Sequence, residues 1–238
     1  MAAAEFPFRV WSEPSFESSC GALQLVATLA PAEFARISDE YADLLPANLR
    51  HAVVKRRVEF IAGRLAAAIL LHRLGATNTD VGIGEGREPL WPQGYAGSIS
   101  HSNQLVAIMV CRADSTESLG IDTETIDGMN TGSIEQLCLC NEEQHWLTHG
   151  SLSAQTVVIL IFSAKEAFFK CLYPFVGRYF DFQDASVTRL DLAARSIELT
   201  LKVSLNERFF KGYCLSGKFS LSGSSVFTSF ELPAQRRH

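Results

Sequence analysis

The chain has 238 residues, of which 47% are apolar and 20% are charged, and its formal net charge is −5. This composition is typical of a globular protein with a hydrophobic core, and the negative charge excludes broad, non-specific binding to nucleic acid or to an anionic membrane. A chain of this length can form one large domain or two packed lobes.

The two ends and the apolar segments give no sign of export or of a membrane span. The N-terminal residues "MAAAEFPFRVW" lack a basic region followed by a long apolar run, so no signal peptide is expected. The most apolar window, "TVVILIF" at 156–162, is too short to cross a bilayer. Six cysteines in such a chain are expected to be reduced thiols. We therefore predict a cytoplasmic protein.

The first third of the chain predicts strands followed by a long helix. Residues 5–30 have the pattern of short strands and turns. Apolar side chains then recur at helical spacing from Val54 to Leu71, and Gly75 is a natural end for that helix. Three arginines recur every seven residues along this stretch and are expected on one helix face: Arg50, Arg57 and Arg64.

The middle of the chain predicts a loop and then strands. Residues 82–97 are rich in glycine and proline and indicate a loop. The segment "SISHS" leads into "LVAIMVCR", which is typical of a buried strand. A polar turn at 113–118 separates this strand from "LGIDTE". We expect these last two strands to form a hairpin.

The second half repeats the order of helix and strand. Residues 133–149 and 154–172 predict helices, the second of them ended by Tyr173-Pro174. The rest of the chain alternates polar and apolar residues as antiparallel strands do. We therefore predict an α+β fold of two lobes, residues 1–115 and 116–238, with a ligand site in the cleft between them.

The segment "GIDTE" places two acids, Asp122 and Glu124, at alternate positions of a strand. Their side chains lie on the same face, where two carboxylates repel each other and lose hydration. A divalent cation with oxygen ligands would relieve that repulsion. The alternative is a pair of solvated acids at a strand end, which is the commoner situation for an isolated pair of this kind.

A third acid and a lysine lie in "FSAKEAFFK", where Glu166 and Lys170 are one helical turn apart. As structure alone, they would form a surface ion pair worth about 0.3–0.5 kcal/mol. As chemistry, a third carboxylate beside a cation, with a lysine close by, suits phosphoryl transfer. There the acid accepts a proton and the lysine offsets charge on the leaving group.

Ser100 and His101 are adjacent in "GSISHSN", which lacks the G-x-S-x-G motif of a hydrolase nucleophile. Neighbouring strand residues also face opposite ways, which argues against a catalytic pair. A hydroxyl and an imidazole next to a loop that carries Arg87 would suit a phosphate ligand instead.

Other ligand motifs are incomplete. The segment "GIGEG" would need a glycine at position 87 to form a dinucleotide loop, but Arg87 stands there, and the chain contains no P-loop motif. A loosely zinc-like set has tighter cysteine spacing than usual zinc sites, and it remains an alternative: Cys138, Cys140, His145 and His149.

Four segments between residues 46 and 182 occur in an order and spacing that resemble one family: "RRVEFIAGR", "REPLWPQGYAGSISHS", "GIDTE" and "FSAKEAFFKCLYP". The chain resembles the 4′-phosphopantetheinyl transferases of the surfactin-type group, in the branch of enterobactin synthetase component D. The resemblance implies two similar lobes related by a pseudo-two-fold axis, with coenzyme A and Mg²⁺ between them. It also implies transfer of 4′-phosphopantetheine from coenzyme A to a serine of an acyl or peptidyl carrier protein, with release of 3′,5′-ADP. The protein would act as a monomer without nucleic-acid or membrane partners.

The resemblance also assigns roles to individual residues. The metal-binding acids would be Asp122, Glu124 and Glu166. Glu166 would also be the general base, and Lys170 would lie near the pyrophosphate. The residues that contact coenzyme A would be Ser100 and His101 at the 3′-phosphate, with Arg57, Arg64 and Arg87 in the other coenzyme-binding segments.

Some positions depart from the family pattern. Phe162 stands where the surfactin-type enzymes have tryptophan. Phenylalanine at this position is usual in the enterobactin branch. Thr123 is polar where isoleucine or valine is common, and its side chain is expected to point away from the metal. Phe175, Val176 and Phe180 either form part of a carrier-docking surface or complete the core. Two other functions remain alternatives: a coenzyme A-binding module without turnover, and a small zinc protein.

Overall fold

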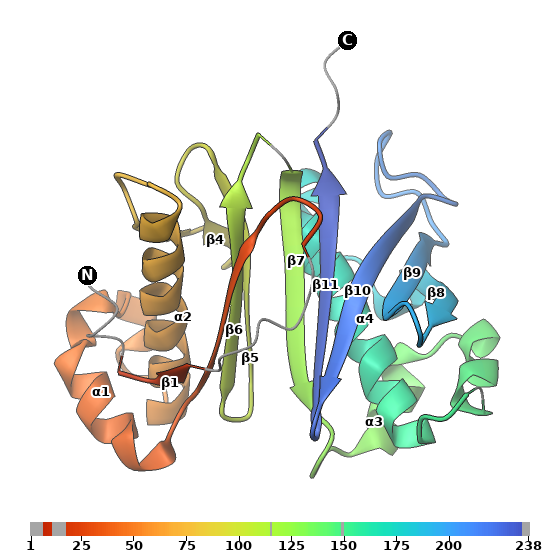
Figure 1. Cartoon of the computed structure of the whole chain (residues 1–238), viewed down its shortest axis with the longest axis horizontal. Helices are drawn as coiled ribbons and strands as arrows, with labels where there is room; N and C mark the ends of the chain where they lie inside the picture. Colours follow the sequence, from red (N-terminus) through yellow and green to blue (C-terminus); the bar gives the residue numbers. More distant parts are fainter. Residues whose placement is uncertain (1–6, 11–17, 115, 149, 235–238) are drawn as a thin grey trace.

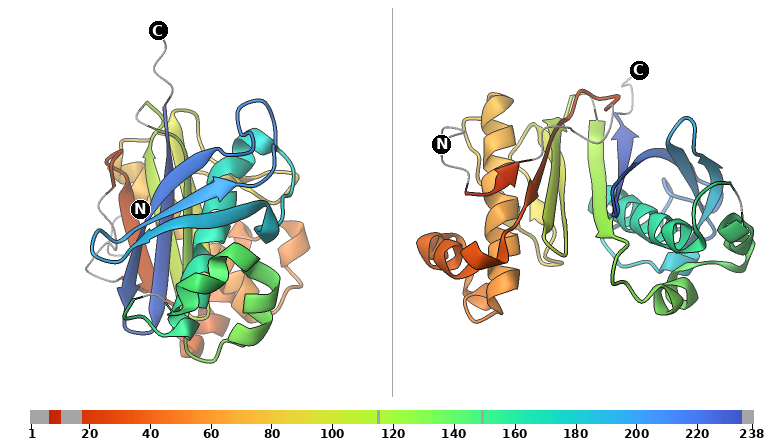
Figure 2. Two further views of the ribbon diagram at one scale, coloured as in Figure 1. Left: turned by 90° about the vertical axis from the view of Figure 1, so that its right-hand side faces the viewer. Right: turned by 60° about the horizontal axis from the view of Figure 1, so that its bottom comes forward.

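A computed structural model describes residues 7–10, 18–114, 116–148 and 150–234. Two antiparallel sheets face each other in the middle of the molecule, and a long helix covers the outer face of each (Figure 2). This arrangement confirms the predicted mixture of helices and sheets. Within the described part of the chain, no helix combines the length and apolar character that a membrane span requires.

The first sheet has the strand order β1-β2-β6-β5. Its strands are β1 (Arg9–Val10), β2 (Leu23–Thr28), β6 (Leu105–Arg112) and β5 (Tyr95–Ser102). Helix α2 (Val54–Arg73) packs against this sheet, and the short helix α1 (Phe34–Glu40) packs against α2 (Figure 1). The core between α2 and the sheet buries side chains such as Ile61, Leu70 and Ile108. The predicted long helix is thus confirmed, and Gly75 follows it with a positive φ of 84°.

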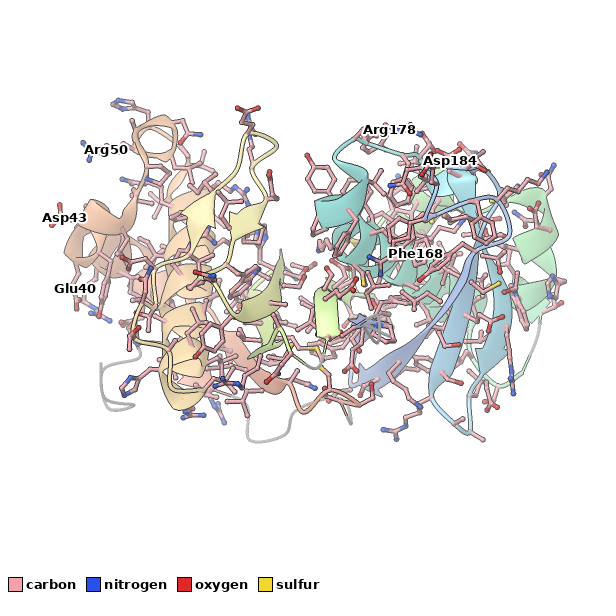
Figure 3. All side chains as sticks on the ribbon, turned by 90° about the horizontal axis from the view of Figure 1, so that it is seen from above. Glu40, Asp43, Arg50, Phe168, Arg178 and Asp184 are labelled. Atoms are coloured by element: carbon pink, nitrogen blue, oxygen red, sulfur yellow. The ribbon has the colours of Figure 1, made fainter. Side chains whose placement is uncertain are left out.

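The second sheet has the order β7-β11-β10-β9-β8. Its strands are β7 (Thr116–Thr125), β11 (Ser225–Pro233), β10 (Cys214–Ser222), β9 (Ser196–Leu201) and β8 (Ala185–Asp191). Helix α4 (Ala154–Val176) crosses its face, and α3 (Thr131–Cys138) packs beside α4. Phe168 of α4 lies inside this half and is fully buried (Figure 3).

Short elements complete the chain. A small hairpin consists of β3 (Gly82–Ile83) and β4 (Pro89–Leu90), within the segment predicted as a loop. The 3₁₀ segments are η2 (Pro31–Glu33), η3 (Ala42–Leu44), η4 (Ala47–Leu49), η5 (Asn141–Thr148) and η6 (Phe182–Asp184).

The two sheets meet along β5 and β7, which are joined by serine side chains. The backbone N–H of Ile121 donates to Ser98 Oγ at 3.0 Å, and that of Thr123 donates to Ser100 Oγ at 3.4 Å. An apolar cluster between the sheets joins Met109 of the first sheet to Phe227 of the second. Strand β7 therefore has its free edge satisfied by hydroxyl groups rather than by a backbone ladder.

Four predictions about the elements are wrong. The hairpin expected from 105–112 and 119–124 does not form, because β6 pairs with β2 and β5 while β7 pairs with β11. Strand β11 lies far along the chain, and a local pattern cannot reveal such a partner. Arg50 is not on the helix face of Arg57 and Arg64. It precedes α2, because the chain makes a 3₁₀ turn at η4 and is extended at Val53 (Figure 3).

The helix predicted at 133–149 is broken into α3 and η5. Leu139 between them is extended, with ψ 130°, because the groups on either side bond elsewhere. Lys165 Nζ donates to the carbonyl of Cys138 at 2.8 Å, and the N–H of Cys140 donates to Glu143 Oε2 at 2.6 Å. Pro174 does not end the second helix either. Helix α4 continues to Val176, because one missing N–H is tolerated close to a C-terminus that Gly177 caps at φ 65°.

The boundary predicted between residues 115 and 116 stays a prediction, and Ser115 lies outside the described residues.

Candidate functional site

A cationic pocket of about 180 Å³ lies between α2, the β3–β4 hairpin and β5. Its charged or titratable lining residues are Arg56, Glu59, Arg64, Arg87 and His101. Guanidinium groups bind phosphate oxygens through paired N–H donors, so this pocket is suited to a phosphorylated ligand.

Arg64 and Arg87 each have an unusual local environment in this pocket. Arg64 Nη2 donates to the carbonyl of Gly82 at 3.2 Å, and its guanidinium stacks on the Phe60 ring at 4.6 Å. Burial lowers the pKa of Arg64 to about 10, and its buried Nε has no hydrogen-bond partner. Arg87 has φ 68°, in the left-handed region that non-glycine residues rarely adopt. Strain of this kind is often retained at ligand sites.

His101 is neutral in this pocket. Arg56 Nη1 lies 2.5 Å from His101 Nε2, and because a guanidinium can only donate, Nε2 must be the acceptor. The proton is then on Nδ1, which faces Glu59 Oε2 at 3.5 Å. Burial, followed by the charges of Arg56 and Lys170, lowers the pKa of His101 to about 4. The imidazole is therefore a fixed donor and acceptor rather than a cation at neutral pH.

An acid–lysine cluster lies at the β5–β7 contact itself, where Ser100 belongs to both. Lys170 Nζ donates to Asp122 Oδ1 at 2.6 Å and to Ser100 Oγ at 3.1 Å. Ser100 Oγ in turn donates to Asp122 Oδ1 at 2.7 Å. Strand β7 comes this close to α4 because of Gly120, where a Cβ would overlap the carbonyl oxygen of Ala167. The glycine of "GIDTE" thus brings Asp122 within reach of Lys170.

The other two predicted acids lie in the electrostatic range of Asp122. Ser102 Oγ donates to Glu124 Oε2 at 2.5 Å. Burial and the charge of Asp122 raise the pKa of Glu124 to about 7. Burial also raises the pKa of Glu166, with Lys170 acting in the opposite direction. The buried Oδ2 of Asp122 has no hydrogen-bond partner. This group of carboxylates is short of positive charge.

The acid–lysine cluster does not have the geometry of a metal site in this structure. Among the residues that the structure describes, no three His, Cys, Asp or Glu side chains are grouped closely enough to hold a metal ion. This finding includes the described members of the zinc-like set. His145 Nδ1 is engaged with the carbonyl of Glu142 at 2.7 Å, and His149 lies outside the described residues.

Lys170 and Ser100 make contacts that the sequence analysis did not anticipate. Within the described residues, Lys170 forms its ion pair with Asp122 rather than with Glu166. Ser100 is 4% exposed and contacts the acid–lysine cluster, whereas the prediction placed it at a coenzyme phosphate. Its predicted phosphate contact stays a prediction.

Sequence reasoning missed Arg56 and two serines. The pocket is lined by Arg56, while the adjacent Arg57, which we predicted to bind the coenzyme, is not among its lining residues. Helix geometry turns adjacent residues by about 100°, so Arg56 and Arg57 lie on different sides of α2, and the predicted role of Arg57 stays a prediction. Ser98 and Ser102 alternate with Ser100 in "SISHS", and that spacing was a usable signal for hydroxyls on one strand face.

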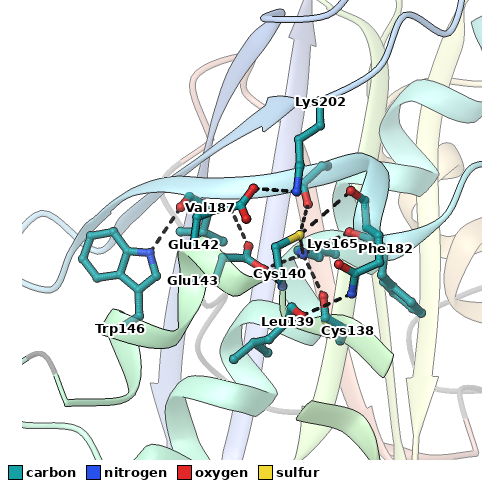
Figure 4. Close-up of polar contacts among 12 residues, drawn as sticks. Cys138, Leu139, Cys140, Glu142, Glu143, Trp146, Lys165, Phe182, Val187 and Lys202 are labelled. Atoms are coloured by element: carbon teal, nitrogen blue, oxygen red, sulfur yellow. Dashed lines mark hydrogen bonds and ion pairs between the residues drawn. The ribbon is translucent and has the colours of Figure 1, made fainter. Parts of the chain in front are cut away.

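Lys165, next to Glu166, belongs to a separate buried network (Figure 4). Its ammonium donates to Glu143 Oε2 at 2.7 Å and to the carbonyls of Cys138 and Phe182 at 2.8 and 3.0 Å. Glu143 Oε1 also accepts the N–H of Val187 at 2.6 Å. This network fixes α3 and η5 against α4 and β8.

Most of the positions singled out beside the family pattern are packed or buried. Phe162 packs on the ring of Phe182, with 5.4 Å between the ring centroids. Thr123 is fully buried, and its hydroxyl has no hydrogen-bond partner. Phe180 belongs to the core of the second half and Val176 packs against it, while Phe175 is 38% exposed.

Comparison with known proteins identifies the family. Residues 45–111 match the family model described as the 4'-phosphopantetheinyl transferase N-terminal domain. Residues 118–219 match the model of the 4'-phosphopantetheinyl transferase superfamily. The chain belongs to the 4'-phosphopantetheinyl transferase superfamily.

Curated members of this superfamily align with the chain at similar identity. The 4'-phosphopantetheinyl transferase PptT of Mycobacterium tuberculosis is 34% identical over 140 residues, which are 59% of this chain and 61% of the relative. Enterobactin synthase component D of Salmonella typhi is 34% identical over 153 residues, 64% of this chain and 63% of the relative. The corresponding protein of Escherichia coli is 36% identical over 125 residues, which are 52% of this chain and 58% of the relative. The chain spans about three fifths of the length of the curated relatives it matches.

Proposed function

We propose that this protein transfers the 4′-phosphopantetheine group of coenzyme A to a serine hydroxyl of an acyl or peptidyl carrier protein and releases 3′,5′-ADP. The observation that carries the proposal is the position of the two charged regions. The acid–lysine cluster lies at the β5–β7 contact beside the cationic pocket, because the charges of both Lys170 and Asp122 act on His101 of the pocket. A ligand with a phosphate at one end and a pyrophosphate at the other fits such a pair.

The pocket would bind the phosphorylated nucleotide end of coenzyme A. Arg56, Arg64 and Arg87 supply donors for phosphate oxygens, and His101 can donate through Nδ1. Glu59 holds Arg56 and His101 in position before the ligand arrives, with Arg56 Nη1 3.7 Å from Glu59 Oε2. Such preorganisation reduces the entropy that binding must overcome.

The donor chemistry of the acid–lysine cluster suits Mg²⁺, although its carboxylates are not grouped closely enough in the described structure to hold the ion already. The unpartnered buried Oδ2 of Asp122 and the raised pKa of Glu124 both indicate a place where a cation would lower the free energy. Asp122, Glu124 and Glu166 would hold it through carboxylate oxygens, which Mg²⁺ prefers. When bound, Mg²⁺ neutralises pyrophosphate oxygens and so favours departure of the nucleotide.

Glu166 and Lys170 would carry out the proton and charge steps. Burial raises the pKa of Glu166, which makes its carboxylate a better acceptor for the proton of the incoming serine. The ammonium of Lys170, 28% exposed at its side chain, offsets negative charge on the leaving phosphate. Ser100 fixes the Lys170 ammonium relative to Asp122.

The larger arrangement is part of the same proposal. The first sheet with α2 and the second sheet with α4 would be two lobes, residues 1–115 and 116–238, related by a pseudo-two-fold axis. The coenzyme would lie in a cleft between them, and the protein would work as a cytoplasmic monomer.

The proposal is tested by the intact mass of an apo carrier protein after incubation with this protein, coenzyme A and Mg²⁺. We expect a mass gain equal to one phosphopantetheine arm, which EDTA prevents and excess Mg²⁺ restores. Asp122→Asn is the matched variant, because it keeps the size of the side chain and removes its charge. Binding of coenzyme A without any mass gain on several carriers would contradict turnover and support a binding module instead.

A further inference from the structure

The seam between the two sheets contains a pair of cysteines outside the proposed site. Cys111 near the end of β6 is 1% exposed and belongs to the apolar cluster that joins the sheets. Cys20 lies in the turn before β2, is half-buried, and packs against the same cluster. Each thiol is the largest cause of the other's pKa shift, so the two side chains are neighbours at this cluster. Pairing of Leu23 in β2 with Val110 in β6 brings their backbones together.

The turn that carries Cys20 is anchored to the second sheet. The N–H groups of Ser19 and Cys20 donate to Glu231 Oε2 of β11 at 3.1 and 3.2 Å, and the hydroxyl of Ser19 donates to the same oxygen. Figure 1 shows the segment before β2 bending over the edge of its own sheet toward β7 and β11. Residues 18–20 therefore touch both sheets.

The two thiols are chemically unequal. The neighbouring Cys111 thiol lowers the pKa of Cys20 to about 7, while Cys20 raises the pKa of Cys111. Ser18 Oγ, 3.3 Å from Cys20 Sγ, acts in the same direction, whereas burial and the charge of Glu231 oppose it. Cys20 is thus a half-buried thiol with a lowered pKa beside a second, buried thiol, which is the arrangement of a reactive cysteine with its resolving partner.

The other cysteines lack this combination. Burial raises the pKa of Cys138 and of Cys171 to about 12, so both remain thiols. Cys214 is exposed on β10 and lies 3.1 Å from the hydroxyl of Thr200. It provides an internal control for simple accessibility.

We propose that Cys20 and Cys111 are a peroxide-reactive thiol pair that closes to a disulfide across the seam between the sheets. The Cys20 thiolate attacks the terminal oxygen of a hydroperoxide, the O–O bond breaks and Cys20 becomes a sulfenic acid. The departing hydroxide or alkoxide takes a proton from the solvent and leaves as water or an alcohol. The sulfur of Cys111 then attacks Cys20 and displaces hydroxide, which takes the Cys111 proton and leaves as water. The two thiols lose two electrons, and the hydroperoxide gains them.

The cross-link would hold the 18–22 turn on β6 while Glu231 holds it on β11. It would close a loop of roughly 90 residues, which constrains the unfolded chain and raises stability. Cys111 pairs with Ala96 at one end of β5, whereas Ser100 and His101 lie toward its other end. We therefore expect the disulfide to leave coenzyme A binding unchanged. The proposal does not depend on the proposed transferase function.

The test is oxidation of the reduced full-length protein with a small excess of hydrogen peroxide, followed by alkylation and tryptic mapping. Trypsin releases Cys20 in the peptide 10–36 and Cys111 in the peptide 88–112, each with a single cysteine. We expect these two peptides to become linked, an intact mass lower by two hydrogen atoms, and a Tm higher by about 5–10 °C that dithiothreitol reverses. The reaction rate should rise with pH and level off above the Cys20 pKa of about 7.

Variants separate this reaction from general oxidation. Cys214→Ser should react as the wild type does, Cys20→Ser should lose the link, and Cys111→Ala should leave a sulfenic acid at Cys20 that dimedone traps. If Cys111→Ala fails to fold, the wild-type map decides alone. Oxidation of Cys214 before Cys20, or conversion of Cys20 to sulfinic acid without a linked peptide, would overturn the proposal.

Discussion

Helix α4 carries two lysine–carboxylate pairs of almost equal length in opposite surroundings. Lys165 lies 2.7 Å from Glu143, and their side chains are 2% and 0% exposed. Lys170 lies 2.6 Å from Asp122, with exposures of 28% and 4%. Distance alone does not distinguish the two pairs.

What differs is how completely each pair is satisfied. Both oxygens of Glu143 accept backbone N–H groups, from Cys140 and Val187, and the Lys165 ammonium also has two backbone carbonyls. In the other pair, Asp122 Oδ2 is buried without a partner. A buried pair with every group bonded fixes structure, and an incomplete one marks a place for a ligand. We infer that Lys165 is structural and that Lys170 belongs to the site.

The largest expected effect is on folding stability when a lysine is replaced. Lys165→Met should lower the free energy of unfolding by about 3–5 kcal/mol, because Glu143 is left as an uncompensated buried charge. Lys170→Met should cost about 1–2 kcal/mol, because its site is partly open to water. Urea denaturation measures both. Mg²⁺ should restore part of the loss in Lys170→Met and none in Lys165→Met, and equal losses with equal Mg²⁺ responses would remove the distinction.

The second effect is on turnover, at the residue next to Lys165. Glu166→Gln should reduce carrier modification by about 10²–10⁴-fold, because the amide cannot accept the serine proton. Its free energy of unfolding should be unchanged or slightly higher, since burial already disfavours the charged form of Glu166. Single-turnover mass spectrometry and urea denaturation of the same preparation give both values. Near-normal turnover would exclude Glu166 as base and as metal ligand.

The third effect compares adjacent arginines of α2. Arg56→Ala should weaken coenzyme A binding by about 10–100-fold, the value of one charge-assisted hydrogen bond to phosphate. Arg57→Ala should change it less than about threefold, because Arg57 does not line the pocket. Isothermal titration calorimetry measures both affinities. Comparable weakening by the two variants would restore the sequence-based assignment of Arg57.

The smallest effect is the pH dependence of stability at His101. The folded pKa of about 4 is below the ordinary value of 6.5, so between these pH values the unfolded chain binds a proton that the folded chain does not. The free energy of unfolding therefore falls as pH falls through this window. His101→Gln should show a shallower fall, whereas the exposed His72→Gln should behave as the wild type. Equal slopes in all three proteins would mean that His101 is protonated in the pocket.

Much of the site chemistry was predictable from local sequence, because neighbours along one element determine it. Asp122 and Glu124 on alternate strand positions, and Glu166 and Lys170 one turn apart, required only the periods of a strand and a helix. The same periods predicted α2 and most of α4. The choice between Arg56 and Arg57 was beyond this reasoning, because it depends on which side of α2 faces the β3–β4 hairpin.

The sequence by itself determined the mixture of helices and strands, the two long helices, and the three acids and the lysine of the acid–lysine cluster. Only the tertiary structure decided the partners: β7 with β11, Asp122 with Lys170, Lys165 with Glu143, and Cys20 with Cys111. The physical reason is that periodicity is a property of neighbouring residues. A contact between residues separated by tens of positions depends on how whole sheets and helices pack.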